Sequence, residues 1–238
     1  MKKVLLFLAF ADLCLAVACI GLCLAHPLEK GIPLLNVCIG NIVVSDVEPE
    51  QTAESSKIAL TFDDGPHPVY TEKLLDGLKE RGVKATFFVT GEHAKLHPEL
   101  IKRMQEEGHL IGNHTYSHIQ LRSDNADEFE EELRRTNAVI EEITGQEVLY
   151  VRPPYGSWDR KLEKKLNMFP VLWTIDPTDW SCLNADTVTK RVVKKARENA
   201  IILLHDYYET SVTAALRIVD LLTKEGYEFV TVDEVLMD

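Results

Sequence analysis

The 238-residue sequence predicts an α/β fold built on about seven parallel strands. From Lys57 onward, short apolar runs alternate with amphipathic segments of helical length. One apolar run recurs roughly every 25–40 residues, the spacing of strands that are joined by helices. This regular alternation favours a (β/α) barrel, with a doubly wound open sheet as the alternative.

Seven apolar runs are strand candidates, in chain order Ile58–Phe62, Thr86–Val89, Leu110–Gly112, Val148–Arg152, Val171–Ile175, Ile201–Leu204 and Phe229–Val230. Six helical patterns separate them, with apolar positions three or four residues apart. They cover Leu74–Leu78, Pro98–Met104, Phe129–Ile143, Trp158–Leu166, Val188–Ala196 and Val212–Leu222. Four of these patterns are followed by a glycine, the residue that most easily forms a left-handed helix cap: Gly82, Gly108, Gly145 and Gly226.

The first 25 residues differ from the rest of the chain. Lys2 and Lys3 precede an almost unbroken apolar run from Val4 to Ala25, which is typical of a secretory signal peptide and long enough for a membrane anchor. Cleavage, lipidation at Cys19 and retention as an anchor all stay open. We expect the chain to be exported, extracellular or held at the cell wall or membrane, with residues 26–56 as a linker or N-terminal arm and 57–238 as the folded domain.

Charge and cysteine content exclude two classes of protein. The formal net charge of −12 argues against nucleic-acid binding, which depends on clustered Lys and Arg. Three of the five cysteines lie in the apolar N-terminal segment, which leaves Cys38 and Cys182. We expect free thiols rather than a disulfide framework, with a single bridge as the alternative.

The reactive side chains follow the strand candidates. Because the carboxyl ends of parallel strands meet at one edge, we expect these side chains to lie at a common rim. They come from five segments: Asp63-Asp64, Asn113–His118, Arg152–Gly156, Asp176–Trp180 and His205-Asp206.

Two of these segments predict a metal site. His114 and His118, four residues apart on an expected helical turn, would point the same way. With one aspartate of the Asp63-Asp64 pair they complete a two-His, one-carboxylate set that leaves coordination positions open. The set lacks thiolates, so it suits zinc, with cobalt, nickel or another divalent ion as alternatives. The pattern does not decide which aspartate is the ligand.

In order and spacing, five motifs resemble those of polysaccharide deacetylases, the NodB-like domains of carbohydrate esterase family 4. The motifs are TFDDGP at Thr61–Pro66, HTYSH at His114–His118, RPPYG at Arg152–Gly156, DPTDW at Asp176–Trp180 and LLH at Leu203–His205. The resemblance covers roughly Lys57 to Leu236 and implies a distorted (β/α) barrel.

The resemblance also implies a role for each residue. Asp64, His114 and His118 would hold the metal, and Asp63 would be the general base, kept ionised and oriented by Arg152. Tyr155 would donate its backbone N–H to the oxyanion and contact the substrate. His205 would be the general acid, and Asp176 the carboxylate that keeps it charged. Trp180 and Leu203 would line the slot for the acetyl group.

The implied function is a metal-dependent hydrolase that removes N-acetyl groups from cell-wall glycans, with peptidoglycan N-acetylglucosamine as the leading substrate. N-acetylmuramic acid, chitooligosaccharides and O-acetylated polysaccharides are alternatives, and a catalytically silent glycan-binding module is a different class. We also consider Tyr207 or Tyr208 as part of a glycan subsite, since sugars stack on aromatic faces. The other histidines, His26, His67, His93, His97 and His109, are interpreted as structural or solvated.

Overall fold

The computed structural model describes residues 55–237, without the side chains of residues 163 and 164. These residues belong to one compact unit, Thr52–Asp238. The predictions for the N-terminal apolar segment, the arm and Cys38 lie outside the described residues. Within residues 55–237, no helix has both the length and the apolar character needed to cross a membrane.

The described residues form a sheet of seven strands in which every pairing is parallel. The strands are β1 (Ser56–Asp63), β2 (Thr86–Val89), β3 (Leu110–Asn113), β4 (Tyr150–Val151), β5 (Phe169–Pro170), β6 (Ala200–His205) and β7 (Tyr227–Val230). Their order is β5-β4-β3-β2-β1-β6. The remaining strand, β7, shares one edge of β1 with β2: β7 pairs with Ser56–Ala59 and β2 with Thr61–Asp63.

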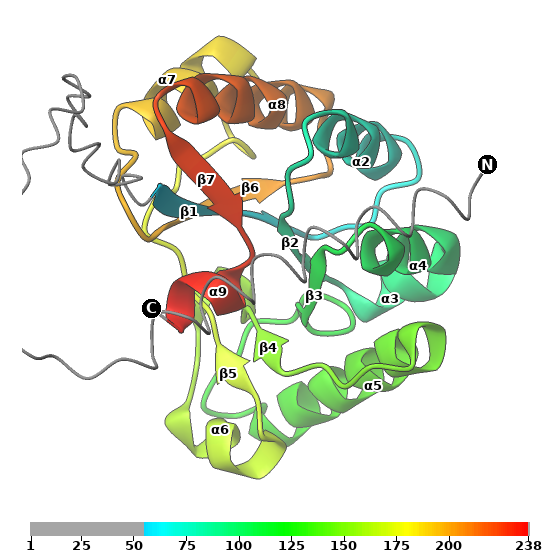
Figure 1. The fold of residues 1–238 in the computed structure, drawn as a ribbon. Coiled ribbons are helices and arrows are strands. Elements are labelled where there is room, and N and C mark those ends of the chain that lie inside the picture. The colour runs from blue at the N-terminus through cyan, green and yellow to red at the C-terminus, as the bar shows by residue number, and fades with distance from the viewer. Residues whose placement is uncertain (1–54, 238) are drawn as a thin grey trace, which may run out of the picture. The chain divides into compact units, whose positions relative to one another are not determined.

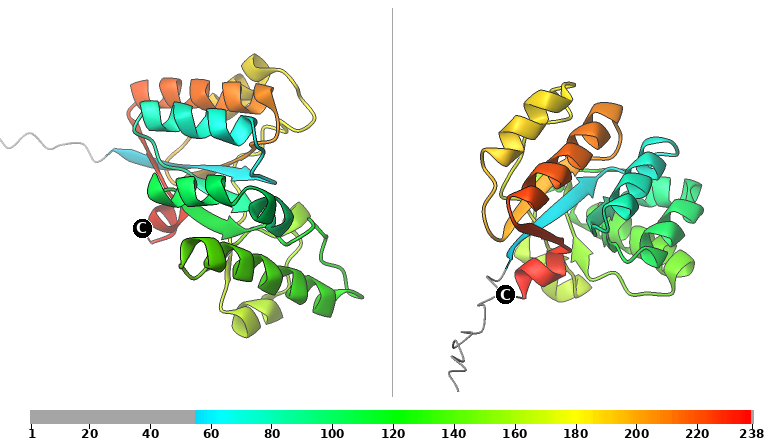
Figure 2. Two further views of the ribbon diagram at one scale, coloured as in Figure 1. Left: turned by 90° about the vertical axis from the view of Figure 1, so that its right-hand side faces the viewer. Right: turned by 45° about the horizontal axis from the view of Figure 1, so that its top comes forward.

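The sheet curls into an incomplete barrel, as Figures 1 and 2 show, and this confirms the predicted fold class. After β5 the chain returns to the free edge of β6, where Ile175 forms an isolated bridge with Ile202. The prediction of a regular strand over Val171–Ile175 is wrong. The carbonyl groups of Val171 and Leu172 accept hydrogen bonds from the Arg152 guanidinium, so they are engaged by a side chain and not by a neighbouring strand.

Helices cover the outer face of the sheet, except for the last one, which packs on the inner face. They are α2 (Tyr70–Glu80), α3 (Gly91–Leu96), α4 (Pro98–Glu106), α5 (Ala126–Thr144), α6 (Arg160–Leu166), α7 (Ala185–Val193), α8 (Glu209–Lys224) and α9 (Val232–Leu236). All six predicted helices are present, and α3 and α9 are two short additions. Helices α7, α8 and α2 lie side by side along one part of the sheet (Figures 1 and 2).

Strand β1 shows how the sheet is filled on both faces. Ile58, Leu60 and Phe62 are buried in the main core with the helices. Ala59 belongs to a smaller apolar cluster on the inner, concave face of the sheet. Val232 and Val235 of α9 complete this cluster. Fully burying an aliphatic or aromatic side chain of this size stabilises a fold by roughly 1.5–3 kcal/mol. Side chains alternate along a strand, so the inner face continues from Ala59 to Asp63 at the carboxyl end of β1.

Candidate active site

A pocket of about 360 Å³ lies at the carboxyl ends of the strands. All five segments with predicted site residues contribute to it, which agrees with a common rim. Nine of its lining residues were predicted: Asp63, Asp64, His114, His118, Tyr155, Asp176, Trp180, Leu203 and His205. Pro153 and Trp173 complete the lining, and Arg152 lies buried behind it.

The backbone at this rim is strained at five non-glycine residues with a positive φ: Asp64 (74°), Thr115 (62°), His118 (60°), Tyr155 (60°) and Thr178 (56°). A left-handed conformation costs a residue with a Cβ atom about 1–2 kcal/mol. Such strain persists where the surrounding structure enforces it, and it concentrates at functional sites. Four of the five pocket-forming segments therefore contain a strained residue that helps to fix the direction of their side chains.

His114 and His118 face one another, with ring centroids 5.0 Å apart. The expected helical turn is wrong, because the chain between them is irregular and both Thr115 and His118 have positive φ. The Nδ1 atom of His114 lies 2.5 Å from the Arg152 carbonyl oxygen. A carbonyl oxygen only accepts hydrogen bonds, so Nδ1 carries a proton and Nε2 is the nitrogen left free to bind a metal.

Asp64 lies between the two rings. Its Oδ1 atom is 3.4 Å from Nε2 of His114 and 3.4 Å from Nε2 of His118. One candidate ligand atom from each of the three residues can be chosen so that all lie within 4.8 Å of one another. Burial raises the pKa of Asp64, but the interactions with His114, His205 and His118 in their protonated forms outweigh burial and lower it to about 2. The carboxylate is thus ionised at neutral pH.

Asp63 points to the other side of the turn, toward Arg152. Its Oδ1 atom accepts a hydrogen bond of 2.8 Å from Nη1 of Arg152, whose side chain is fully buried. The same nitrogen donates to Oγ1 of Thr61 at 2.6 Å, and the guanidinium lies 4.2 Å from the centre of the Phe88 ring. The guanidinium therefore compensates the buried charge of Asp63 and fixes its orientation.

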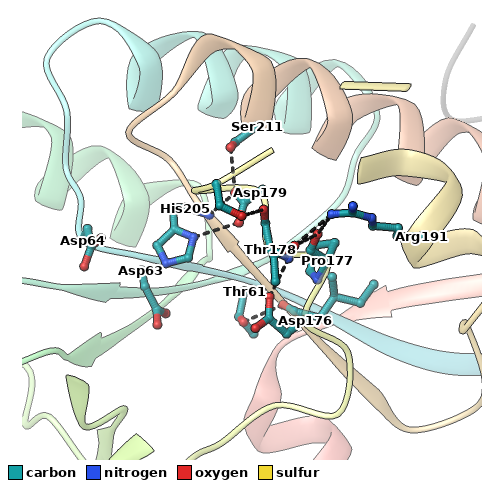
Figure 3. Close-up of polar contacts among 12 residues, drawn as sticks. Thr61, Asp63, Asp64, Asp176, Pro177, Thr178, Asp179, Arg191, His205 and Ser211 are labelled. Carbon is teal, nitrogen blue, oxygen red and sulfur yellow. Dashed lines mark hydrogen bonds and ion pairs between the residues drawn. The ribbon is translucent and has the colours of Figure 1, made fainter. Parts of the chain in front are cut away.

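His205 is the cross-strand neighbour of Asp63, in register between β6 and β1. Its carboxylate partner is Asp179, whose Oδ1 atom lies 2.9 Å from Nδ1 of His205 (Figure 3). The prediction that Asp176 holds this imidazole is wrong. Oδ1 of Asp176 accepts a 2.6 Å hydrogen bond from the backbone N–H of Thr178, and the left-handed Thr178 then turns the chain so that the second aspartate of DPTDW meets His205.

The electrostatic surroundings keep His205 charged. Burial lowers the pKa of this imidazole, but the hydrogen bond and charge of Asp179, together with the charges of Asp63 and Asp64, raise it to about 9. With Nδ1 donating to Asp179, Nε2 is the nitrogen that can give a proton to a group in the pocket.

The three predicted substrate contacts, Tyr155, Trp180 and Leu203, line the same pocket. Tyr155 belongs to a 3₁₀ turn, η1 (Pro154–Gly156), and its exposed ring packs edge-on against His118. Leu203 is buried in β6, and Trp180 is 56% exposed, so Leu203 forms an apolar floor and Trp180 a face that solvent can reach.

Other predicted residues lie away from this pocket. Tyr207 packs against His67 and His93 and does not line the pocket. His93 has a structural role, since its Nδ1 atom lies 2.8 Å from the Asp64 carbonyl oxygen. His109 is buried and accepts a hydrogen bond from the backbone of Ala85. Within the described residues, Cys182 is a free thiol.

Sequence reasoning missed three residues: Asp179, which bonds to His205, Ser211, which bonds to Asp179, and Arg191, which bonds to the loop that carries Asp179. A signal for Asp179 was present, because DPTDW contains a second aspartate three residues after Asp176. No local pattern marks Ser211 or Arg191, because both lie within the helices α8 and α7 and the sequence does not show which side chains of a helix reach the loop.

The sequence is similar to those of known proteins. The family model described as polysaccharide deacetylase matches residues 50–171. The peptidoglycan-N-acetylmuramic acid deacetylase PdaC of Bacillus subtilis is 40% identical over 193 residues, which are 80% of this chain and 41% of that protein. The peptidoglycan-N-acetylglucosamine deacetylase PgdA of Listeria monocytogenes is 38% identical over 194 residues, 82% of this chain and 41% of PgdA. The chain thus spans about two fifths of the length of these relatives.

The fold is similar to solved structures as well. The structure of PdaC matches with a TM-score of 0.75 at 41% identity, over 77% of this chain and 91% of the PdaC chain. A family 4 acetyl xylan esterase from Clostridium thermocellum, solved in complex with a cobalt ion, matches with a TM-score of 0.71 at 34% identity, over 76% of this chain and 90% of the esterase. From the family-model match and these similarities in sequence and fold, the chain belongs to the polysaccharide deacetylase family.

Proposed function

We propose that the chain is a metal-dependent N-deacetylase that releases acetate from N-acetylated cell-wall glycans. One observation carries this proposal: an Asp63–Arg152 pair and an Asp179–His205 pair face one pocket from neighbouring strands, beside a cluster of three metal-ligand side chains. Amide hydrolysis needs a base for water and an acid for the departing amine, and these two pairs supply them.

Asp64, His114 and His118 fit a divalent metal ion. Oδ1 of Asp64 is buried without a hydrogen-bond partner among the described residues, as expected for a ligand atom. The His114 ring is already held in the tautomer that binds through Nε2. Nitrogen and oxygen donors without thiolate suit zinc, with cobalt or another divalent ion as alternatives. When bound, such an ion acidifies water and polarises a carbonyl group.

The residues of the chain then have distinct tasks. Asp63 takes the proton of the attacking water molecule while Arg152 holds the carboxylate in place. The backbone N–H of Tyr155, in the first turn of η1, is a donor for the oxygen that becomes negative on the attacked carbonyl carbon. As the C–N bond breaks, Nε2 of His205 gives its proton to the departing nitrogen, and the products are acetate and a free amine.

The apolar part of the pocket fits a small acyl group. Leu203 and Trp180 line the pocket beside the reactive residues, and together they form a slot for the acetyl methyl group. The exposed Trp180 ring also offers a stacking face for the sugar that carries the acetamide.

We propose peptidoglycan N-acetylglucosamine as the substrate. PgdA is named for this sugar and PdaC for N-acetylmuramic acid, so muramic acid deacetylation is the first alternative. Deacetylation of chitooligosaccharides and O-deacetylation, the activity named for the Clostridium thermocellum esterase, are further alternatives with the same chemistry.

The N-terminal sequence supports a location outside the cytoplasm. The charged start and apolar run of residues 1–25 are typical of a signal peptide or anchor, and cell-wall glycans lie outside the membrane. We therefore propose an exported catalytic domain, either released or held at the membrane or wall. Protease treatment of intact cells tests this location, because only an external domain is degraded.

A catalytically silent glycan-binding module is the alternative from another class. A silent relative would lack a ligand, the base or the acid. In this chain the three ligand residues, the base and the acid all line one pocket, which favours the enzyme.

Acetate release tests the proposed function. The purified protein is incubated with intact peptidoglycan, chitooligosaccharides and an acetylated xylan, with and without a chelator, followed by added Zn²⁺ or Co²⁺. We expect release from peptidoglycan that the chelator abolishes and the metal restores. Binding to glycan without acetate release, in a metal-loaded protein, would favour the silent module.

A further inference from the structure

Ser211 lies behind the proposed general acid. It is the third residue of α8 and fully buried, and its hydroxyl group donates a 2.6 Å hydrogen bond to Oδ2 of Asp179 (Figure 3). Asp179 is fully buried as well. A buried carboxylate is stable only when hydrogen-bond donors replace the water that it has lost.

The other donors to this carboxylate belong to His205. The His205 backbone N–H donates to Oδ2 at 2.9 Å, and the ring Nδ1 donates to Oδ1 at 2.9 Å. Both bonds therefore involve the residue that Asp179 has to orient. Ser211 comes from a different element, 32 positions along the chain, and supplies a donor that does not depend on the position of His205.

We infer that Ser211 is a positioning residue for the deacetylation reaction: its hydroxyl group fixes the plane of the Asp179 carboxylate and thereby directs Nε2 of His205 toward the departing nitrogen. This inference rests on the proposed function. Ser211 itself does not line the pocket, so it acts only through Asp179 and His205.

The leaving group of the substrate separates this role from a general structural one. An acetamide releases an amine, which must receive a proton as the C–N bond breaks. An aryl acetate releases a phenolate, which leaves without one. A defect in the acid therefore slows acetamide hydrolysis selectively, whereas loss of folded enzyme or of the metal slows both reactions equally.

The experiment compares Ser211→Ala with the wild type on an N-acetylated oligosaccharide and on an aryl acetate. We expect kcat for the acetamide to fall about tenfold, which corresponds to about 1.4 kcal/mol in the barrier, with KM unchanged. The aryl acetate rate should change less than about twofold. Thr213→Ala is the matched control, since it removes a hydroxyl group of the same helix that bonds to the Glu209 carbonyl group and should leave both rates unchanged.

Two further variants keep the test decisive. Ser211→Cys has a similar shape and a weaker donor, so it should show an intermediate loss on the acetamide, and it replaces Ser211→Ala if that variant does not fold. Ser211→Thr retains the hydroxyl group and should restore most of the acetamide activity. Equal losses on both substrates, or no loss on the acetamide, would overturn the inference. An inactive wild type would instead refute the proposed function.

Discussion

Asp63 and Asp179 are both buried carboxylates beside one pocket, and each is paired with a nitrogen-containing side chain, Arg152 or His205. Asp63 lies on β1, and its partner Arg152 also bonds to Thr61 and to two backbone carbonyl groups inside the curled sheet. Asp179 lies in a loop, and its partners are His205 on β6 and Ser211 on α8.

The two pairs differ in how they respond to pH. A guanidinium group stays protonated in proteins, so Arg152 keeps its charge. The imidazole of His205 titrates, with a pKa raised to about 9. The base side, Asp63 with Arg152, is held inside the curled sheet. The acid side, His205 with Asp179, joins a titratable imidazole on β6 to a carboxylate on a loop. Damage to the base side should lower activity and stability, and damage to the acid side should have effects that depend on pH and on the leaving group.

The Asp63-Asp64 turn offers the largest expected effect. Asp63→Asn removes the proposed base and should lower kcat on the order of 10²–10⁴-fold, while the affinity for Zn²⁺ stays near that of the wild type. Asp64→Asn should lower metal affinity as well as activity. Metal content after dialysis, measured beside acetate release, distinguishes the two. Reversed phenotypes would exchange the roles of base and ligand.

Arg152→Met tests whether the base side supports the fold. The variant leaves Asp63 buried without its cation, and removing one partner of a buried pair costs roughly 3–5 kcal/mol in the free energy of unfolding. Urea unfolding measures this loss, with Arg197→Met as a control at an exposed residue. Replacing Asp63 by Leu in the Arg152→Met background should recover part of the stability. No recovery would show that the cost comes from lost packing and not from the unpaired charge.

Asp179→Asn tests the acid side. The folded pKa of His205 lies above its usual value of 6.5, so its contribution to stability is fully present below about pH 6.5 and is lost as the pH rises through about 9. The variant should be less stable than the wild type by up to roughly 3 kcal/mol at pH 6, and this difference should shrink toward pH 10. The alkaline limb of kcat should also move to lower pH. A difference in stability that is independent of pH would contradict this account.

The sequence predicted the framework of the site better than its contacts. Parallel strands and their carboxyl ends follow from alternating patterns, so a common rim with Asp63, His114, Arg152 and His205 could be expected from the sequence alone. Metal-ligand spacing predicted the His114–His118 pair, although the connecting turn is irregular and not helical, because positive φ angles cannot be deduced from side-chain spacing.

Contacts within irregular segments were not predictable in the same way. The pairing of His205 with Asp179 instead of Asp176 depends on the left-handed Thr178, and a β-branched residue rarely adopts that conformation. Val171–Ile175 has the composition of a strand, but the Arg152 side chain occupies two of its carbonyl groups. In both places a side chain from another segment overrides the local preference: Arg191 bonds to Thr178, and Arg152 bonds to Val171 and Leu172.

Arg191 on α7 tests the loop Asp176–Trp180, which carries the carboxylate partner of His205. Its replacement has the smallest expected effect on activity. Its Nη1 atom donates to the Pro177 carbonyl oxygen and to Oγ1 of Thr178, each at 2.8 Å (Figure 3). These bonds hold the strained residue that directs Asp179 toward His205. Arg191→Met should therefore lower kcat for an acetamide by about three- to tenfold, or roughly 0.7–1.4 kcal/mol, with metal affinity unchanged.

Chemical rescue measures this effect directly. Arg191 lies at the surface, so free guanidinium ions at millimolar concentration can reach the same two oxygen atoms in the Arg191→Ala variant. We expect them to restore part of the activity there and to have no effect on Lys190→Met, a control one residue earlier on the helix. Because Arg191 is expected to act on the acid through Asp179, the loss and the rescue should be seen with an acetamide and be absent with an aryl acetate. Rescue on both substrates would mean that Arg191 supports the whole pocket, and the contrast between a fixed base side and an adjustable acid side would then not extend to this helix.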